Sequence, residues 1–172
     1  MTEYQKPKGT RDFYPNEKRT RQVLFDRFRT LALRYGYGEI ETPAFEYLDY
    51  LTAKSGEAIK DDIFVLEQRG AEKFGLRFDL TVPAARMFLQ KQKELPKPVK
   101  WFYTDNMWRY ESPQKGRLRE FYQVGVELFG TDKSEADAEV IALAIDFLEE
   151  LGLKAGQFIV KLNNRKLLEG LV

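Results

Sequence analysis

Apolar side chains in this chain recur every three or four residues in some stretches and alternate with polar ones in others. The first stretch of the helical kind contains Val23, Leu24, Phe28, Leu31 and Tyr35. This spacing is typical of one buried face of an α-helix. Asn16 is placed to cap the helix, and Gly36 and Gly38 are placed to end it. The pattern therefore predicts a helix from about residue 16 to residue 35.

A short strand over 39–43 is expected next, ended by Pro43. A helix over 44–56 follows, with Phe45, Leu48 and Leu51 on one side. Runs rich in β-branched and aromatic residues at 62–68 and 76–80 flank a glycine-bounded turn and predict a β-hairpin. Thr81, shortly before Pro83, is a candidate N-cap for a helix that runs to about residue 93.

The stretch 100–130 holds two aromatic-rich, strand-like runs around the polar loop ESPQKGR. A helix over 135–151 follows, with Ser134 and Asp137 spaced as in a capping box. A strand at 157–164 and the start of a further helix at 165–172 complete the order. Tight hairpins with covering helices predict an α+β fold with an antiparallel sheet. The chain contains neither a P-loop nor a Rossmann glycine fingerprint.

Composition narrows the chemistry available to this chain. Its 172 residues are 43% hydrophobic and 32% charged with a net charge of +1, which suits one globular domain. The absence of histidine and cysteine excludes disulfides, Ser–His or Cys–His catalysis and nearly all zinc sites. Any catalysis must then rely on carboxylates, Arg, Lys, a bound metal or positioning alone, and no residue is assigned as a metal ligand. No apolar run reaches membrane-spanning length and no secretory signal begins the chain, so we expect a cytoplasmic protein without membrane contact.

The 100–130 stretch concentrates long charged side chains beside aromatic ones. Arg109 and Glu111 lie two residues apart on an extended segment and so share a face, where one could bind phosphate and the other a base or ribose. An ion pair on a solvated sheet is the alternative. Lys115 and Arg117 could close over an anion, or could simply be a solvated hairpin tip.

The second strand of this hairpin offers further candidates. Phe121, between Arg119 and Gln123, could stack on a purine or could belong to the core. Gln123 and Glu127 share a face with Gly125 between them, which leaves room either for a small ligand or for packing.

Asp79 and Thr81 lie two apart at a strand-to-helix junction, where Asp79 would suit an ammonium group and Thr81 could merely cap the helix. Each of these signals is weak alone. Because they fall on the faces of two adjacent hairpins, their combination favours a binding site over plain packing.

Five segments of the chain resemble histidyl-tRNA synthetases, which are class II aminoacyl-tRNA synthetases, especially those of the archaeal and eukaryotic types. WRYESPQKGRLREFYQVGVELFG resembles the second class II motif in its histidyl form, and LRFDLTVPAAR resembles the amino-acid-binding strand and helix. KGTRDFYP resembles the N-terminal opening, and GYGEIETPAFEYLDYL resembles the first motif with its proline. FIVKLNNRKLLEG resembles the segment before the insertion domain. The resemblance covers almost the whole chain, in the family's order.

The resemblance implies a role for each candidate. Arg109 would bind the α-phosphate of ATP and act in catalysis. Glu111 would contact adenine, Arg117 the terminal phosphates, and Phe121 would stack on the base. Histidine would be held by Asp79, Leu80 and Thr81, by Arg109, and by Gln123 and Glu127, with Glu127 accepting a hydrogen bond from the imidazole. Adenylate formation depends mainly on positioning and on charge neutralisation by Arg and the Mg²⁺ that ATP carries, so it does not need a histidine in the chain.

The resemblance also implies a truncated class II sheet, with residues 1–172 as the N-terminal part of the catalytic domain. The third motif, the RGLDYY-like segment, the insertion domain and the anticodon-binding domain do not occur in these residues. We therefore expect this chain alone to be inactive, or nearly so, in histidine activation. The parent enzyme would use histidine, ATP and tRNA(His), and would form a homodimer around Pro43. The alternatives are a regulatory paralogue of histidine biosynthesis, a non-catalytic dimerisation module and, fitting less well, an asparagine- or aspartate-type synthetase.

Overall fold

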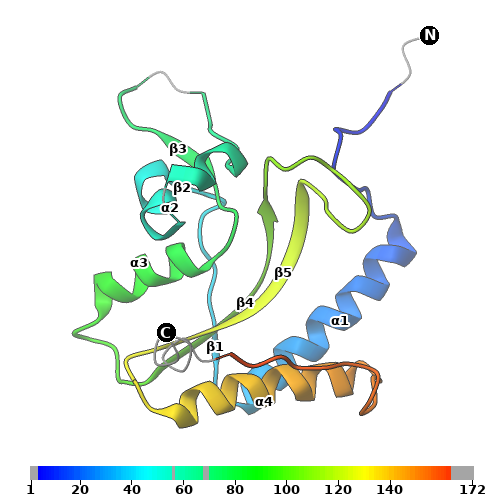
Figure 1. The fold of residues 1–172 in the computed structure, drawn as a ribbon, viewed down its shortest axis with the longest axis vertical. Coiled ribbons are helices and arrows are strands. Elements are labelled where there is room, and N and C mark those ends of the chain that lie inside the picture. Colours follow the sequence, from blue (N-terminus) through cyan, green and yellow to red (C-terminus); the bar gives the residue numbers. More distant parts are fainter. Residues whose placement is uncertain (1–3, 56, 68–69, 164–172) are drawn as a thin grey trace, which may run out of the picture.

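A long antiparallel ribbon of two strands, β4 (Val99–Trp108) and β5 (Glu120–Phe129), runs through the middle of the molecule (Figure 1). The computed structural model describes residues 4–55, 57–67 and 70–163. The two strands pair without a break, from Val99 opposite Phe129 to Trp108 opposite Glu120. The short strand β1 (Gly38–Glu39) pairs in parallel with β4, so the sheet order is β1-β4-β5.

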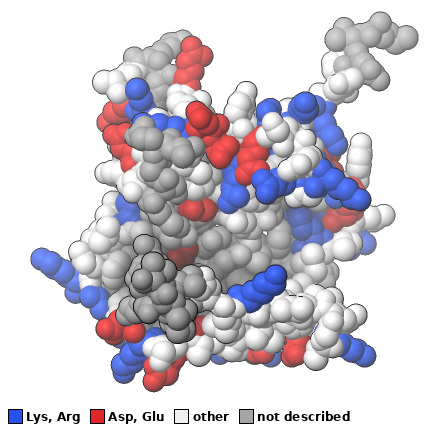
Figure 2. Space-filling model, viewed as in Figure 1, with Lys and Arg blue, Asp and Glu red and all other residues white. Residues whose placement is uncertain are grey.

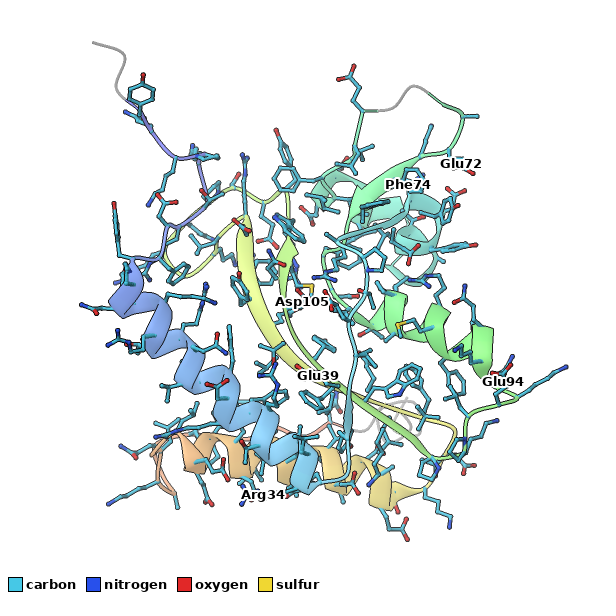
Figure 3. The ribbon with its side chains drawn as sticks, turned by 180° about the vertical axis from the view of Figure 1, so that it is seen from behind. Arg34, Glu39, Glu72, Phe74, Glu94 and Asp105 are labelled. Carbon is cyan, nitrogen blue, oxygen red and sulfur yellow. The ribbon has the colours of Figure 1, made fainter. Side chains whose placement is uncertain are left out.

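One face of this ribbon is covered by two helices, α1 (Pro15–Arg34) and α4 (Ser134–Glu150). Because side chains alternate along a strand, Phe102 of β4 faces these helices and packs with Phe28, Leu31 and Leu143 in one core. Val124, Val126 and Leu128 of β5 pack against the same core. At the far end of α1, Arg34 forms an ion pair with Glu150 of α4; Figure 3 labels Arg34 there.

The opposite face of the ribbon is only partly covered. Helix α3 (Thr81–Lys91) packs on it through Ala84, together with Leu80, Tyr103 and Met107. In Figure 2 the middle of this face is hollowed over β4 and β5, and blue and red side chains gather along the upper rim of the hollow. A face that is half open and rimmed by charge is where a polar ligand could lie.

A small lobe beside the ribbon contains β2 (Phe45–Tyr47), α2 (Leu48–Ser55), the 3₁₀ helix η1 (Glu57–Asp62) and β3 (Phe74–Leu76). Strands β2 and β3 pair antiparallel, and the ring of Phe74, labelled in Figure 3, contacts the rings of Phe45 and Tyr47. The core of the lobe is formed by Leu48, Leu51, Ile63 and Phe78.

A buried arginine joins this lobe to the ribbon. Arg77 is 2% exposed, and its Nη2 lies 2.5 Å from Oδ1 of Asp105 on β4. Its Nη1 donates to the backbone oxygen of Thr42 at 2.6 Å and to the Thr42 hydroxyl at 2.9 Å. Figure 3 labels Asp105 where β4 faces the lobe. Since buried charges are stable only when paired, Arg77 fixes the lobe at one position along β4.

The α+β class, the 100–130 hairpin and the helices near 16–35, 81–93 and 135–151 are confirmed, with ends that shift by one or two residues. The helix expected over 44–56 is wrong in its first part, because residues 45–47 pair as a strand with β3. The strand expected over 39–43 is reduced to Gly38–Glu39.

Four further predictions fail or fall outside the described residues. The stretch 62–67 contributes only an isolated bridge from Val65 to Gly75, and 157–163 forms neither helix nor strand. The cap residue of α4 is Lys133, and the Ser134 hydroxyl contacts Glu135 instead of closing a capping box. The helix start expected at 165–172 lies outside the described residues.

Candidate functional site

The start of α3 is tied to β5 by a hydrogen bond between two of the expected histidine-binding residues. The Thr81 hydroxyl donates to Oε1 of Glu127 at 2.9 Å. The N-cap residue of α3 is Leu80, and no side chain caps the helix there. The capping role considered for Thr81 is therefore wrong, because its hydroxyl lies on the sheet side of the helix and meets a carboxylate 46 residues away.

Gln123 lies on the same face of β5 as Glu127, as the alternation predicts, and pairs with Asp105 across the ribbon. Its Oε1 is buried and accepts no hydrogen bond from the described residues. A buried amide oxygen without a donor costs free energy, and such atoms usually have a partner. A ligand with an N–H or ammonium group would supply the missing donor.

Gly125 does not leave room for a ligand. A Cβ built at this position would lie 2.4 Å from Cζ and from the hydroxyl oxygen of Tyr103, the residue opposite it on β4. The ring of Tyr103 therefore fills the space above Gly125, and of the two possibilities left open by the sequence the packing one is correct. Tyr103 was not singled out by the sequence, since only the strand register brings it beneath the site.

Tyr103 of β4 lies close to side chains from two other segments, Glu127 of β5 and Asp79 before α3. Burial, together with the negative charges of Glu127 and Asp79, raises the pKa of Tyr103 to about 12. Both carboxylates are thus within electrostatic range of one phenol. Asp79, from the link between β3 and α3, and Glu127 from β5 are brought together around Tyr103, on the open face of the ribbon.

The raised pKa of Tyr103 predicts a loss of stability in alkali. Because the folded state holds the phenol proton more tightly than the unfolded chain, Tyr103 stabilises the fold fully below pH 10, and this contribution is lost between about pH 10 and pH 12. Urea unfolding at a series of pH values should show this decline. Tyr103→Phe should decline less steeply over the same interval, and equal slopes for the two proteins would contradict the assignment.

Arg109, Glu111 and Arg117 form a chain of contacts at the mouth of the hairpin. Arg109 and Glu111 come just after β4, and their Nη1 and Oε1 atoms are 3.9 Å apart. Glu111 also pairs with Arg117 at 3.2 Å across the loop. The guanidinium of Arg109 lies 5.1 Å from the centroid of the Phe121 ring, and its Nε donates to the Phe78 backbone oxygen at 3.3 Å. A cation and an aromatic face are thus presented together.

The N-terminal arm contacts the hairpin at its loop end, where β5 begins, and the sequence did not reveal this contact. The backbone oxygen of Gly9 accepts hydrogen bonds from the backbone N–H groups of Arg119, at 2.7 Å, and Glu120, at 3.2 Å. Gly9 has a φ of +84°, and a Cβ there would lie 2.8 Å from Cγ of Arg119. Glycine is required by both constraints. The arm therefore fixes the position at which β5 begins.

Pro43 lies on the surface, close in sequence to exposed aromatic side chains of the small lobe. Phe45, Tyr47 and Tyr50 are 40–49% exposed. Within the described ranges, no three Asp or Glu side chains come together as metal ligands could, and no helix is long and apolar enough to span a membrane.

An antiparallel ribbon with helices behind it and a charged, half-open face in front is the arrangement of a class II aminoacyl-tRNA synthetase core. A family model described as Histidyl-tRNA synthetase matches residues 9–172. The chain is 45% identical over 169 residues to the histidine–tRNA ligase of Haloarcula marismortui and 44% identical over 162 residues to that of Pyrococcus abyssi. The chain belongs to the histidyl-tRNA synthetase family.

Solved structures agree with this assignment. The histidyl-tRNA synthetase of Nostoc sp. superposes with a TM-score of 0.79 at 33% identity, over 98% of this chain and 39% of that one. A Bacillus halodurans protein, described as an ATP phosphoribosyltransferase regulatory subunit/histidyl-tRNA synthetase, gives a TM-score of 0.79 at 35% identity over 88% of this chain. The match to the Haloarcula relative includes 98% of this chain but only 39% of that protein. The match to the Pyrococcus relative includes 94% of this chain and 37% of that protein. The chain thus spans less than half the length of these relatives.

Proposed function

We propose that this chain forms the histidine- and ATP-binding half of a histidine–tRNA ligase, whose whole protein forms histidyl-adenylate and transfers histidine to tRNA(His). The observation that carries the proposal is the hydrogen bond from Thr81 to Glu127 on the face of β5 that also presents Gln123. The buried Oε1 of Gln123 accepts no hydrogen bond from the described residues. These polar groups face an open side of the sheet in a chain of this family.

On the amino-acid side, the α-ammonium of histidine would donate to Asp79, Thr81 and the Gln123 oxygen. Leu80, which lies between Asp79 and Thr81 in the sequence, would contribute its backbone to the same pocket. The imidazole would donate to Glu127, whose orientation is held by the Thr81 hydroxyl. Two carboxylates at this position suit a ligand that carries one ammonium and one ring N–H.

On the nucleotide side, Arg109 would leave its contact with Glu111 to bind the α-phosphate while the histidine carboxylate attacks. Adenine would then stack on Phe121, Glu111 would accept from the base, and Arg117 would bind the terminal phosphates. Mg²⁺ would arrive on the triphosphate of ATP. The present distances support an exchangeable network, because the Arg109–Glu111 pair is long and partly exposed.

The surface around Pro43 is the proposed contact between two copies in a homodimer. Its exposed aromatic side chains support this, since large exposed apolar groups concentrate at interfaces. We place the protein in the cytoplasm, where its family's substrates are found.

A regulatory paralogue is the second candidate. It is favoured by the Bacillus halodurans structure, whose description names both a regulatory subunit and a synthetase. Such a protein would share the histidine site without charging tRNA.

A chimera separates the two candidates. In this chimera, residues 9–163 of this chain replace the matching part of the Haloarcula ligase. The rest of the chimera is the Haloarcula sequence. Histidine-dependent exchange of pyrophosphate into ATP is expected if the chain is a synthetase half. A folded chimera that binds histidine but shows no exchange would favour the regulatory candidate and contradict the ligase.

Within the same chimera, Arg109→Gln should lower the rate of exchange by about 100-fold or more, because one lost cationic or hydrogen-bonding group at a developing charge typically costs this much. Arg29→Gln, which removes a partly exposed arginine of α1 that pairs with Glu39, is the matched control and should leave the rate unchanged. An Arg109→Gln chimera as fast as its parent would rule out the role assigned to this residue.

A further inference from the structure

A cavity lined by two arginines lies behind the hairpin, on the face of β5 that is covered by α1. Its volume is about 250 Å³, and it is lined by the N-terminal arm, α1 and β5. The lining residues that matter here are Arg11, Phe13, Arg21, Glu120 and Tyr122. None of these five belongs to the proposed histidine or ATP sites, although Phe121, proposed to stack on adenine, also lines the cavity.

Arg21 is the unusual member of this group. Its guanidinium is held between two rings, with Cζ 3.9 Å from the centroid of Phe13 and 4.0 Å from that of Tyr122. Both rings lie against the guanidinium, but aromatic rings do not replace the hydrogen-bond acceptors that its N–H groups need. Nε and Nη1 are buried, and neither donates to any of the described residues.

Buried guanidinium donors without acceptors are costly, and cation–π contacts return only part of that cost. The carboxylates nearby are engaged elsewhere. Glu17 pairs with Arg11 at 2.6 Å, and Glu120 accepts from Nδ2 of Asn106 at 3.2 Å. Neither forms an ion pair with Arg21. The buried Nε and Nη1 of Arg21 therefore have no hydrogen-bond acceptor among the described residues.

We propose that this cavity binds a phosphate group, with Arg21 as its principal donor and Arg11 as the second. A guanidinium edge presents parallel N–H groups that match phosphate oxygens, and a tetrahedral phosphate can accept from two arginines at once. The phosphate could belong to a small molecule or to an RNA backbone. Lys6 and Lys8, both exposed on the arm, would extend the positive surface toward a longer strand.

The direct test follows the ¹⁵N–¹H resonance of the Arg21 side-chain Nε in this chain. Inorganic phosphate at millimolar concentration should move it saturably, whereas chloride at equal ionic strength should not. A shift that is absent, or that appears equally at every arginine with ionic strength, overturns the proposal.

Variants sharpen this test. Arg21→Gln should weaken phosphate binding at least about tenfold, while Arg19→Gln, an equal charge change at an exposed position of the same helix, should not. Glu120→Gln should tighten binding severalfold, because it removes a negative charge from the cavity. If Arg21→Gln does not fold, the Arg21 resonance and the Glu120→Gln titration still decide the question. Unchanged binding in Glu120→Gln would contradict the site.

A second titration with a short single-stranded RNA identifies the source of the phosphate. RNA binding much tighter than inorganic phosphate, and lost in Arg21→Gln, indicates a nucleic-acid backbone. Phosphate binding without added affinity for RNA indicates a small molecule. Failure of both ligands to move Arg21 contradicts the proposal while leaving the histidine–ATP site untouched, since neither Arg21 nor Arg11 is a binding residue of that site.

Discussion

Arg77→Met should lower the free energy of unfolding by about 3–5 kcal/mol, because removing one partner of a buried ion pair leaves the other uncompensated. The substitution strands the Asp105 carboxylate and removes the donor that now serves the Thr42 hydroxyl and backbone oxygen. Urea denaturation followed by circular dichroism measures the change. The small lobe should also lose its fixed position on β4, since Arg77 is the charged link between them.

Two further proteins make this prediction specific. Asp105→Asn in the Arg77→Met background should restore part of the loss, because the stranded charge is then gone. Arg29→Met removes a surface pair with Glu39 in which both side chains are about 40% exposed, and should cost less than about 1 kcal/mol. Equal losses in Arg77→Met and Arg29→Met would show that burial of Arg77 does not govern the effect.

Gly125→Ala should destabilise the chain by about 2–3 kcal/mol, the usual cost of forcing an extra group into a packed region. The new methyl group would meet the ring of Tyr103 at 2.4 Å, and the ten paired positions of the ribbon prevent the backbone from moving away. Because Glu127 and Asp79 are within electrostatic range of Tyr103, displacing its ring should weaken histidine binding as well.

Gly70→Ala is the matched control for this substitution. Nothing lies within 4 Å of a Cβ at Gly70, so its stability should be unchanged or slightly higher. Tyr103→Leu combined with Gly125→Ala should recover stability relative to Gly125→Ala alone, since the shorter side chain vacates the space. A Gly125→Ala protein as stable as the parent chain would mean that the ring is not held where the register puts it.

Local patterns in the sequence were sufficient for the elements whose stability is local. The 3–4 spacing of apolar residues predicts α1, α3 and α4, and the aromatic runs around a polar loop predict β4 and β5. Phe45 shows the limit of this approach. Its spacing to Leu48 and Leu51 fits a helix, yet it lies in a strand because its ring contacts Phe74, which comes 29 residues later.

The candidate site was predictable in its residue types and faces, and less so in its contacts. Gln123 and Glu127 share a face because strands alternate, which the sequence alone implies. The bond from Thr81 to Glu127, the ring of Tyr103 beneath Gly125 and the buried link from Arg77 to Asp105 all join distant segments. Tertiary packing determines such contacts, and no local spacing signals them.

In the proposed function, the open face of the ribbon binds histidine through Asp79, Thr81, Gln123 and Glu127. The decisive experiment is a titration of this chain with histidine, followed by the ¹⁵N–¹H resonances of Thr81 and of the Gln123 side-chain amide. Saturable shifts at millimolar histidine are predicted, reduced strongly in Glu127→Gln and with imidazole-propionate, which lacks the ammonium group. Resonances that stay unmoved by histidine, or that respond equally to imidazole-propionate, would contradict the claim.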